Sequence, residues 1–167
     1  MSAVDEVLER NRDYAAAFAQ GDAPRAPTLP LVVLTCIDAR SQPARFLGLG
    51  VGEAHVVRNA GGRATDDALR SIIVSTQLLG TRECMVIHHT DCGMETFTNE
   101  GFRARLKAET GASADDLDFM PFTDLEASAQ DDVRTIRANP LMPRDLEVSA
   151  WIYDVRTGTL TEVPVPD

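Results

Sequence analysis

The sequence predicts a single α/β domain with a mostly parallel central sheet, flanking helices and a C-terminal hairpin. Short apolar runs without polar alternation, such as residues 31–35, are typical of strands covered on both faces, as in a parallel sheet. Segments with helical periodicity separate these runs, and such alternation implies right-handed crossovers between parallel strands. A length of 167 residues suits one domain with a sizeable core, so residues 1–167 are treated as one unit.

Residues 1–29 are expected to form an N-terminal helix and a connector. Residues 3–20 carry apolar side chains at helical spacing, with Ser2 as a cap and Gly21 as a stop. Residues 23–30 contain three prolines and predict an extended connector. This helix can pack on the core or on a second subunit, and the sequence does not choose between them.

Three strands are expected next, at residues 31–35, 54–58 and 83–88. The intervening helices are expected after Pro43, which suits a first helical position, and over residues 66–79, where Thr65 or Asp66 supplies a cap. If the first strand lies between the other two, their carboxyl ends meet where the strand order reverses. Open sheets bind ligands at that point.

The C-terminal part is expected to add two helices and the hairpin. The helices are predicted over residues 99–109 and from the capping-box spacing at residues 123–126 to about residue 138. The hairpin combines strands at residues 147–154 and 160–165.

Composition and charge exclude several classes of function. The chain is 44% hydrophobic and 25% charged, as in ordinary soluble proteins, and its net charge of -10 disfavours nucleic-acid or anionic-membrane partners. No apolar stretch approaches the length of a membrane span, and the acidic, polar N-terminus does not resemble a signal peptide. We therefore expect a cytoplasmic protein that binds neither nucleic acid nor membranes.

Three cysteines exclude a complete disulfide framework because their number is odd. Cys84 lies inside an apolar run and is expected to be an inert core residue. Cys36, His89 and Cys92 instead follow the ends of two predicted strands. Two thiols and one imidazole suit zinc, and three protein ligands leave a fourth position open, as in catalytic zinc sites.

Other interpretations of these three residues stay open on this ground alone. They can be unrelated residues at strand ends. A structural zinc site needs a fourth ligand, for which Cys84, His55 and His88 are less well placed, and an iron–sulfur cluster normally needs a fourth thiolate. A catalytic thiol with a histidine partner is the strongest local competitor.

Three motifs stand out along residues 30–95. They are Cys36-x-Asp38-x-Arg40, Val57-Arg58-Asn59-Ala60-Gly61 and His89-x-x-Cys92-Gly93. Together with residues 153–158, which are similar to a closing hairpin, they resemble the β-class carbonic anhydrases. His88 and Met94 depart from the glycines usual there, and this segment resembles the compact subfamily that includes carbonyl sulfide hydrolases. The resemblance implies a β-carbonic anhydrase-like fold and a zinc lyase that interconverts carbon dioxide and bicarbonate.

The resemblance also implies that Cys36, His89 and Cys92 bind one Zn²⁺ per subunit, and that Asp38 and Arg40 form a catalytic dyad. Zinc lowers the pKa of bound water from about 15.7 to near 7, and the resulting zinc-bound hydroxide attacks carbon dioxide. Arg40 is expected to hold Asp38 away from the metal. If that pair breaks, Asp38 can become a fourth ligand and close the site.

Glycines are the candidate substrate-binding residues. The resemblance implies that Gly93 presents a backbone N–H near the substrate. Gly61 and Gly62, just before a helix start, can form an amide-rich anion site, and the alternative is a turn in which they supply positive φ. His55 and His88 can shuttle protons, although His55 is expected to be only a hydrogen-bonded neighbour and His88 can instead steer the adjacent histidine ligand.

Partners and alternatives follow from the same resemblance. It implies a homodimer or homotetramer acting on a small neutral substrate. A carbonyl sulfide hydrolase, which releases H2S and CO2, is the first alternative, because it applies the same zinc chemistry to another linear, apolar triatomic. The second is a non-catalytic zinc or thiol protein that senses redox state.

Overall fold

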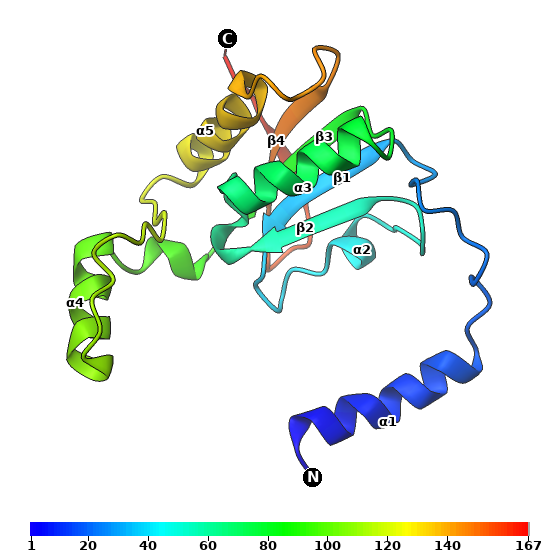
Figure 1. Cartoon of the computed structure of the whole chain (residues 1–167), viewed down its shortest axis with the longest axis horizontal. Helices are drawn as coiled ribbons and strands as arrows, with labels where there is room; N and C mark the ends of the chain where they lie inside the picture. The colour runs from blue at the N-terminus through cyan, green and yellow to red at the C-terminus, as the bar shows by residue number, and fades with distance from the viewer. Residues whose placement is uncertain (167) are drawn as a thin grey trace.

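Five strands form one sheet in the computed structural model, which describes residues 1–166 (Figure 1). The strands are β1 (Leu31–Cys36), β2 (His55–Asn59), β3 (Glu83–His89), β4 (Glu147–Tyr153) and β5 (Leu160–Val163). Their order is β2-β1-β3-β4-β5, with β1 to β4 parallel and β5 antiparallel to β4. The predicted fold class is confirmed, including the place of β1 between β2 and β3.

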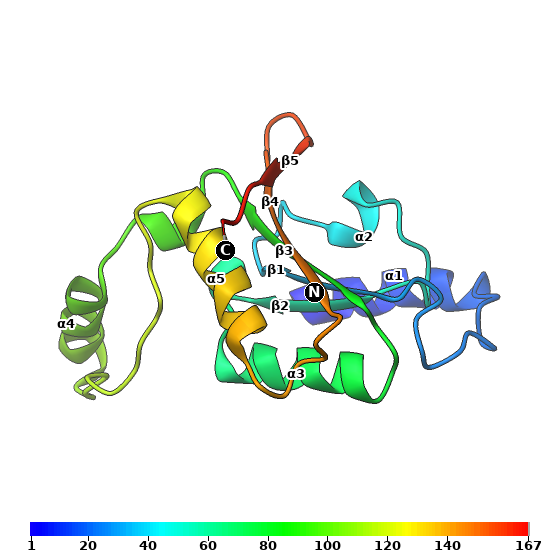
Figure 2. The same cartoon turned by 90° about the horizontal axis from the view of Figure 1, so that it is seen from above.

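Helices cover the two faces of the sheet unequally (Figure 2). Helices α3 (Asp66–Gln77) and α5 (Leu125–Ala138) pack on one face and form the main core with it. That core includes the buried residues Val32, Leu34, Ile72, Val86, Val133 and Ile136. The four-residue helix α2 (Pro43–Phe46) lies on the other face, where Phe46 stacks on Tyr153 with ring centroids 4.2 Å apart.

Helices α1 (Ala3–Ala16) and α4 (Asn99–Thr110) project from the sheet and bury no residue (Figure 1). The expectation that the first helix reaches residue 20 is wrong, because α1 ends at Ala16. A helix gains most of its stability from packing, and no residue of α1 is buried by the rest of residues 1–166, so packing does not stabilise a longer last turn. No helix within residues 1–166 is long and apolar enough to cross a membrane.

Other element bounds agree with the predictions within two residues, with two differences in detail. The cap of α5 is Asp124, whose side chain accepts a hydrogen bond from the Ala127 amide at 2.9 Å, rather than Thr123. The segment with Gly61 and Gly62, for which a turn was one of two alternatives, contains a 3-10 helix, η1 (Ala60–Gly62), and a second one, η2 (Gly93–Glu95), follows Cys92.

Candidate metal centre

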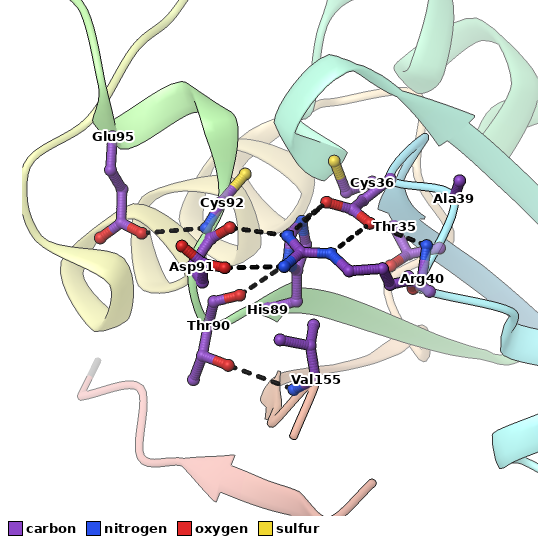
Figure 3. A network of polar contacts seen from close by, with 12 residues as sticks. Thr35, Cys36, Ala39, Arg40, His89, Thr90, Asp91, Cys92, Glu95 and Val155 are labelled. Carbon is purple, nitrogen blue, oxygen red and sulfur yellow. Dashed lines mark hydrogen bonds and ion pairs between the residues drawn. The ribbon is translucent and has the colours of Figure 1, made fainter. Parts of the chain in front are cut away.

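The three sulfur and nitrogen ligands predicted from separate motifs come together at the carboxyl edge of the sheet (Figure 3). Cys36 ends β1 and His89 ends β3, and the parallel register that pairs Thr35 with Ile87 places these two ends side by side. Cys92 follows on the next loop. One ligand atom from each of the three residues lies within 4.8 Å of the others, and all three residues are buried.

The imidazole of His89 is oriented as a ligand. Its Nδ1 donates a hydrogen bond to the Thr90 carbonyl at 2.9 Å, which leaves Nε2 as the free acceptor. Nε2 is buried without a hydrogen-bond partner among the described residues. A buried polar atom in that condition is costly unless something else binds it. The orphaned nitrogen and the two adjacent sulfurs therefore fit a zinc ion.

The two thiols are polarised by each other. The adjacent Cys92 thiol lowers the pKa of Cys36 well below its ordinary value, against the effect of burial and with help from His89. The same contact with Cys36 raises the pKa of Cys92. Burial disfavours a charged His89, but the nearby Cys36 sulfur and the Thr90 carbonyl favour the protonated ring, and together they raise the pKa of this imidazole. The cluster thus stabilises negative charge on the Cys36 sulfur, which suits a divalent cation.

Asp38 and Arg40 form a forked ion pair beside the cluster. Arg40 Nε lies 3.0 Å from Asp38 Oδ1, Arg40 Nη2 lies 2.7 Å from Oδ2, and the Arg40 backbone amide also donates to Oδ1 at 2.8 Å. The guanidinium hydrogen bonds lower the pKa of Asp38 to about 2. Asp38 Oδ2 lies 3.8 Å from His89 Nε2. The carboxylate is therefore ionised, restrained by Arg40 and close to the free ligand nitrogen.

Asp91 is a site residue that the sequence interpretation missed. Arg40 Nη1 donates to Asp91 Oδ2 at 2.7 Å, and Nη2 donates to the Asp91 carbonyl at 2.8 Å (Figure 3). Asp91 adopts a left-handed backbone with φ 57°, which aspartate tolerates better than most residues. The sequence signal that could have identified Asp91 is its position between the predicted ligands His89 and Cys92. Arg40 consequently ties the loop after β1 to the loop that carries Cys92.

Arg58 of β2 supports the loop that follows β1. Its guanidinium donates to the carbonyls of Cys36 at 3.0 Å, and of Asp38 and Ser41 at 2.9 Å each. These contacts set the path of the backbone that carries the cysteine ligand and the dyad. The guanidinium of Arg58 is thus engaged by backbone carbonyls.

Gly61 and Gly62 are buried and left-handed, with φ 81° and 70°. A Cβ on Gly62 would lie 2.9 Å from the Thr35 carbonyl carbon. The turn interpretation therefore describes their geometry, and an anion site there stays a prediction. The space around a Cβ at Gly93 is open to 4 Å, and its role toward substrate likewise stays a prediction.

The two other histidines lie apart from the ligand cluster. His55 pairs with Val32 at the opposite end of β1 from Cys36, and its Nδ1 lies 2.7 Å from Ser75 Oγ. His88 points to the other face of β3 from His89, since adjacent strand residues alternate, and its Nε2 lies 3.0 Å from Asp132 Oδ2. His55 is a hydrogen-bonded neighbour, whereas His88 belongs to a buried network behind the site.

Comparisons with known proteins identify the family of this chain. The carbonic anhydrase family model matches residues 31–160. The chain is 40% identical over 165 residues to beta-carbonic anhydrase 1 of Mycobacterium tuberculosis, covering 98% of this chain and 99% of the relative. It is 34% identical to a carbon disulfide hydrolase of Saccharolobus solfataricus, covering 94% and 87%.

Solved structures give the same result. A carbonic anhydrase from Streptococcus mutans superposes with a TM-score of 0.95 at 44% identity, covering 98% of this chain and 99% of the other. An apo carbon disulfide hydrolase superposes with a TM-score of 0.71 at 31% identity, covering 96% and 89%. The chain therefore belongs to the β-carbonic anhydrase family, within the compact subfamily whose relatives include carbon disulfide hydrolases.

Proposed function

We propose that this protein is a zinc-dependent carbonic anhydrase that interconverts carbon dioxide and bicarbonate. The observation that carries the proposal is the buried Cys36, His89 and Cys92 cluster, with an unpartnered imidazole nitrogen, beside an ionised Asp38. The 40% identity to a beta-carbonic anhydrase over nearly the whole chain supports the same activity.

Zinc held by these three residues supplies Lewis acidity that brings the pKa of water near neutrality. The chain's own residues supply orientation. Asp38 is held as a carboxylate by Arg40, so its free lone pairs accept a hydrogen bond from the attacking water. Arg40 is itself braced by Asp91, which keeps the carboxylate from turning toward the ligand nitrogen. This geometry favours the open state of the site over the closed one.

Hydrolysis of carbonyl sulfide or carbon disulfide is the second candidate. The carbon disulfide hydrolase relative at 34% identity, which covers 94% of the chain, favours it specifically. The candidate substrates are linear and apolar, and the same ligand set serves each of them. A redox sensor without turnover is the third possibility and predicts a stable, inactive protein that lacks zinc.

Rates on matched substrates separate these functions. Purified protein is assayed by stopped flow for carbon dioxide hydration, and by H2S release from carbonyl sulfide and carbon disulfide. We expect one zinc per subunit and carbon dioxide hydration as the faster reaction. Cys36→Ser should lose zinc and activity, whereas Cys84→Ser, a matched control in the core, should keep both. Faster H2S release would favour the hydrolase, and a folded wild type without zinc or turnover would overturn the proposal.

A homodimer or homotetramer is part of the proposal. Helix α1 exposes apolar side chains that a partner can cover, namely Val4, Val7, Leu8 and Tyr14. The sheet face beneath α2 also leaves Met85 and Trp151 only partly buried. A cytoplasmic location is proposed because a reducing compartment keeps the ligand thiols free.

A further inference from the structure

Asp132 of α5 is a carboxylate buried at the centre of a polar cluster behind the candidate metal centre. Only 1% of its surface is exposed. Its Oδ2 lies 3.0 Å from His88 Nε2 and forms an ion pair with Arg63 Nε at 2.9 Å, while Oδ1 accepts from the Ala64 amide at 2.9 Å. A carboxylate this buried is costly unless both oxygens are engaged, as they are here.

These contacts join three elements that are distant in sequence. His88 immediately precedes the ligand His89 on β3, and Arg63 with Ala64 immediately follows η1. Arg63 also reaches α5 through Ser128 Oγ at 2.7 Å. Asp132 thus fastens the end of β3 and the end of η1 to the same helix.

The side chain of Asn59, which precedes η1, hydrogen-bonds to the backbone of Arg63, which follows it. Asn59 Oδ1 accepts from the Arg63 amide at 2.8 Å, and Asn59 Nδ2 donates to the Arg63 carbonyl at 2.7 Å. The side chain of Asn59 therefore bridges the whole segment from β2 to Arg63. A displacement of Arg63 or Ala64 is therefore transmitted to Gly61 and Gly62, which lie between Asn59 and Arg63.

Those glycines lie against both cysteine loops. The Cβ position of Gly62 is 3.0 Å from the Cys36 amide nitrogen, and that of Gly61 is 3.0 Å from Met94 Cγ, two residues beyond Cys92. A displacement of η1 would therefore move the backbone of Cys36 and the loop of Cys92 directly.

Phe122 makes a second link between the cluster and the ligands. Its ring stacks on His88 with centroids 5.5 Å apart and lies 5.7 Å from the Arg63 guanidinium carbon. The same ring belongs to the small apolar group formed with Cys36, Cys92 and Met94. The ring of Phe122 thus packs against both the charged cluster and the two cysteines.

We propose that Asp132 is a positioning residue for the zinc centre. It anchors η1 and the end of β3 to α5, so that the two sulfurs and the imidazole nitrogen stay close enough to share one ion. Asp132 touches none of the three ligands and acts through Arg63, Ala64 and His88. The inference rests on the proposed zinc function.

The test replaces the carboxylate without changing its shape. Asp132→Asn is compared with wild type for zinc affinity, by competition with a chromophoric chelator, and for the visible absorption of the cobalt(II)-substituted protein, which reports ligand geometry. We expect zinc affinity to fall about tenfold, the lower end of the effect known for residues that orient metal ligands, and the cobalt bands to shift.

Two controls separate positioning from stability. Asp131→Asn removes a neighbouring exposed carboxylate and should leave zinc affinity, cobalt spectrum and thermal unfolding unchanged. Ser75→Ala removes a buried hydrogen bond to Thr81 far from the ligands and should lower the unfolding temperature without moving the cobalt bands.

If Asp132→Asn behaves like Ser75→Ala, less stable but with wild-type zinc affinity and cobalt spectrum, the positioning role is refuted. Should Asp132→Asn fail to fold, Arg63→Lys provides the same comparison, because lysine keeps the charge but loses the forked geometry. A wild type that binds no zinc would refute the proposed function itself and this inference with it. If wild type binds zinc and the variants Asp132→Asn and Arg63→Lys bind it with unchanged affinity and cobalt spectrum, the inference alone is refuted.

Discussion

In the proposed mechanism, Asp38 is the carboxylate that orients the attacking water. Its forked contact with Arg40 keeps it ionised, and its Oδ2 lies 3.8 Å from the ligand nitrogen of His89. Asp38→Asn removes the charge, and Arg40→Ala removes the restraint. We expect both variants to retain zinc, because neither residue belongs to the ligand cluster, and to lose activity on the order of 100-fold or more.

Zinc content and stopped-flow hydration rates, measured on the same preparations, check this expectation. Arg70→Ala is a suitable control, since its ion pair with Asp67 is exposed on α3 and should contribute little. Wild-type rates in both dyad variants would remove the dyad from the mechanism.

Cys84 illustrates how burial alone can make a thiol unreactive. It is fully buried in the main core, and burial raises its pKa to about 12. Because only the thiolate reacts, iodoacetamide at pH 8 should leave Cys84 unlabelled in the folded protein and label it fully in urea. Peptide mass spectrometry measures the labelling. Fast modification in the folded state would mean that this part of the core opens readily.

At the scale of elements, η1 holds the cysteine loops in place. Gly62→Ala imposes a left-handed alanine, at about 1–2 kcal/mol, and pushes its Cβ into the backbone of β1, at about 1–3 kcal/mol more. Gly48→Ala is the matched control, because Gly48 has φ +68° but open space around it, so only the first cost applies. Urea unfolding measures both, and equal losses would mean that η1 yields to accommodate the methyl group.

The strands and their arrangement were predictable from the sequence where a local pattern of residues indicates them. Apolar runs that end at Cys36 and His89 indicate buried strands, and parallel pairing then brings their ends together. The contact between Asp132 and the Ala64 amide was not predictable, since it joins residues 68 positions apart and Asp132 looks like any polar residue of a helix. The early end of α1 was missed because periodicity does not reveal whether a helix has anything to pack against.

At the scale of the whole molecule, α1 is an amphipathic helix that none of the described residues, 1–166, buries (Figure 1). If a second copy covers its apolar side, wild type should run as a dimer or tetramer in size-exclusion chromatography with light scattering. The double variant Val7→Asp with Leu8→Asp should shift the mass toward the monomer, whereas Arg12→Ala should not. A monomeric wild type would contradict the proposed assembly.

X-ray absorption at the zinc K-edge tests the central claim most directly, because it reports the atoms around the ion regardless of activity. The account predicts two sulfurs at about 2.3 Å and a single imidazole nitrogen at about 2.0–2.1 Å, with a light atom in the remaining position. In Cys36→Ser this signature should disappear or lose one sulfur. A wild-type spectrum with four sulfurs, with no sulfur, or without bound zinc would contradict the assignment of Cys36, His89 and Cys92 as the metal ligands.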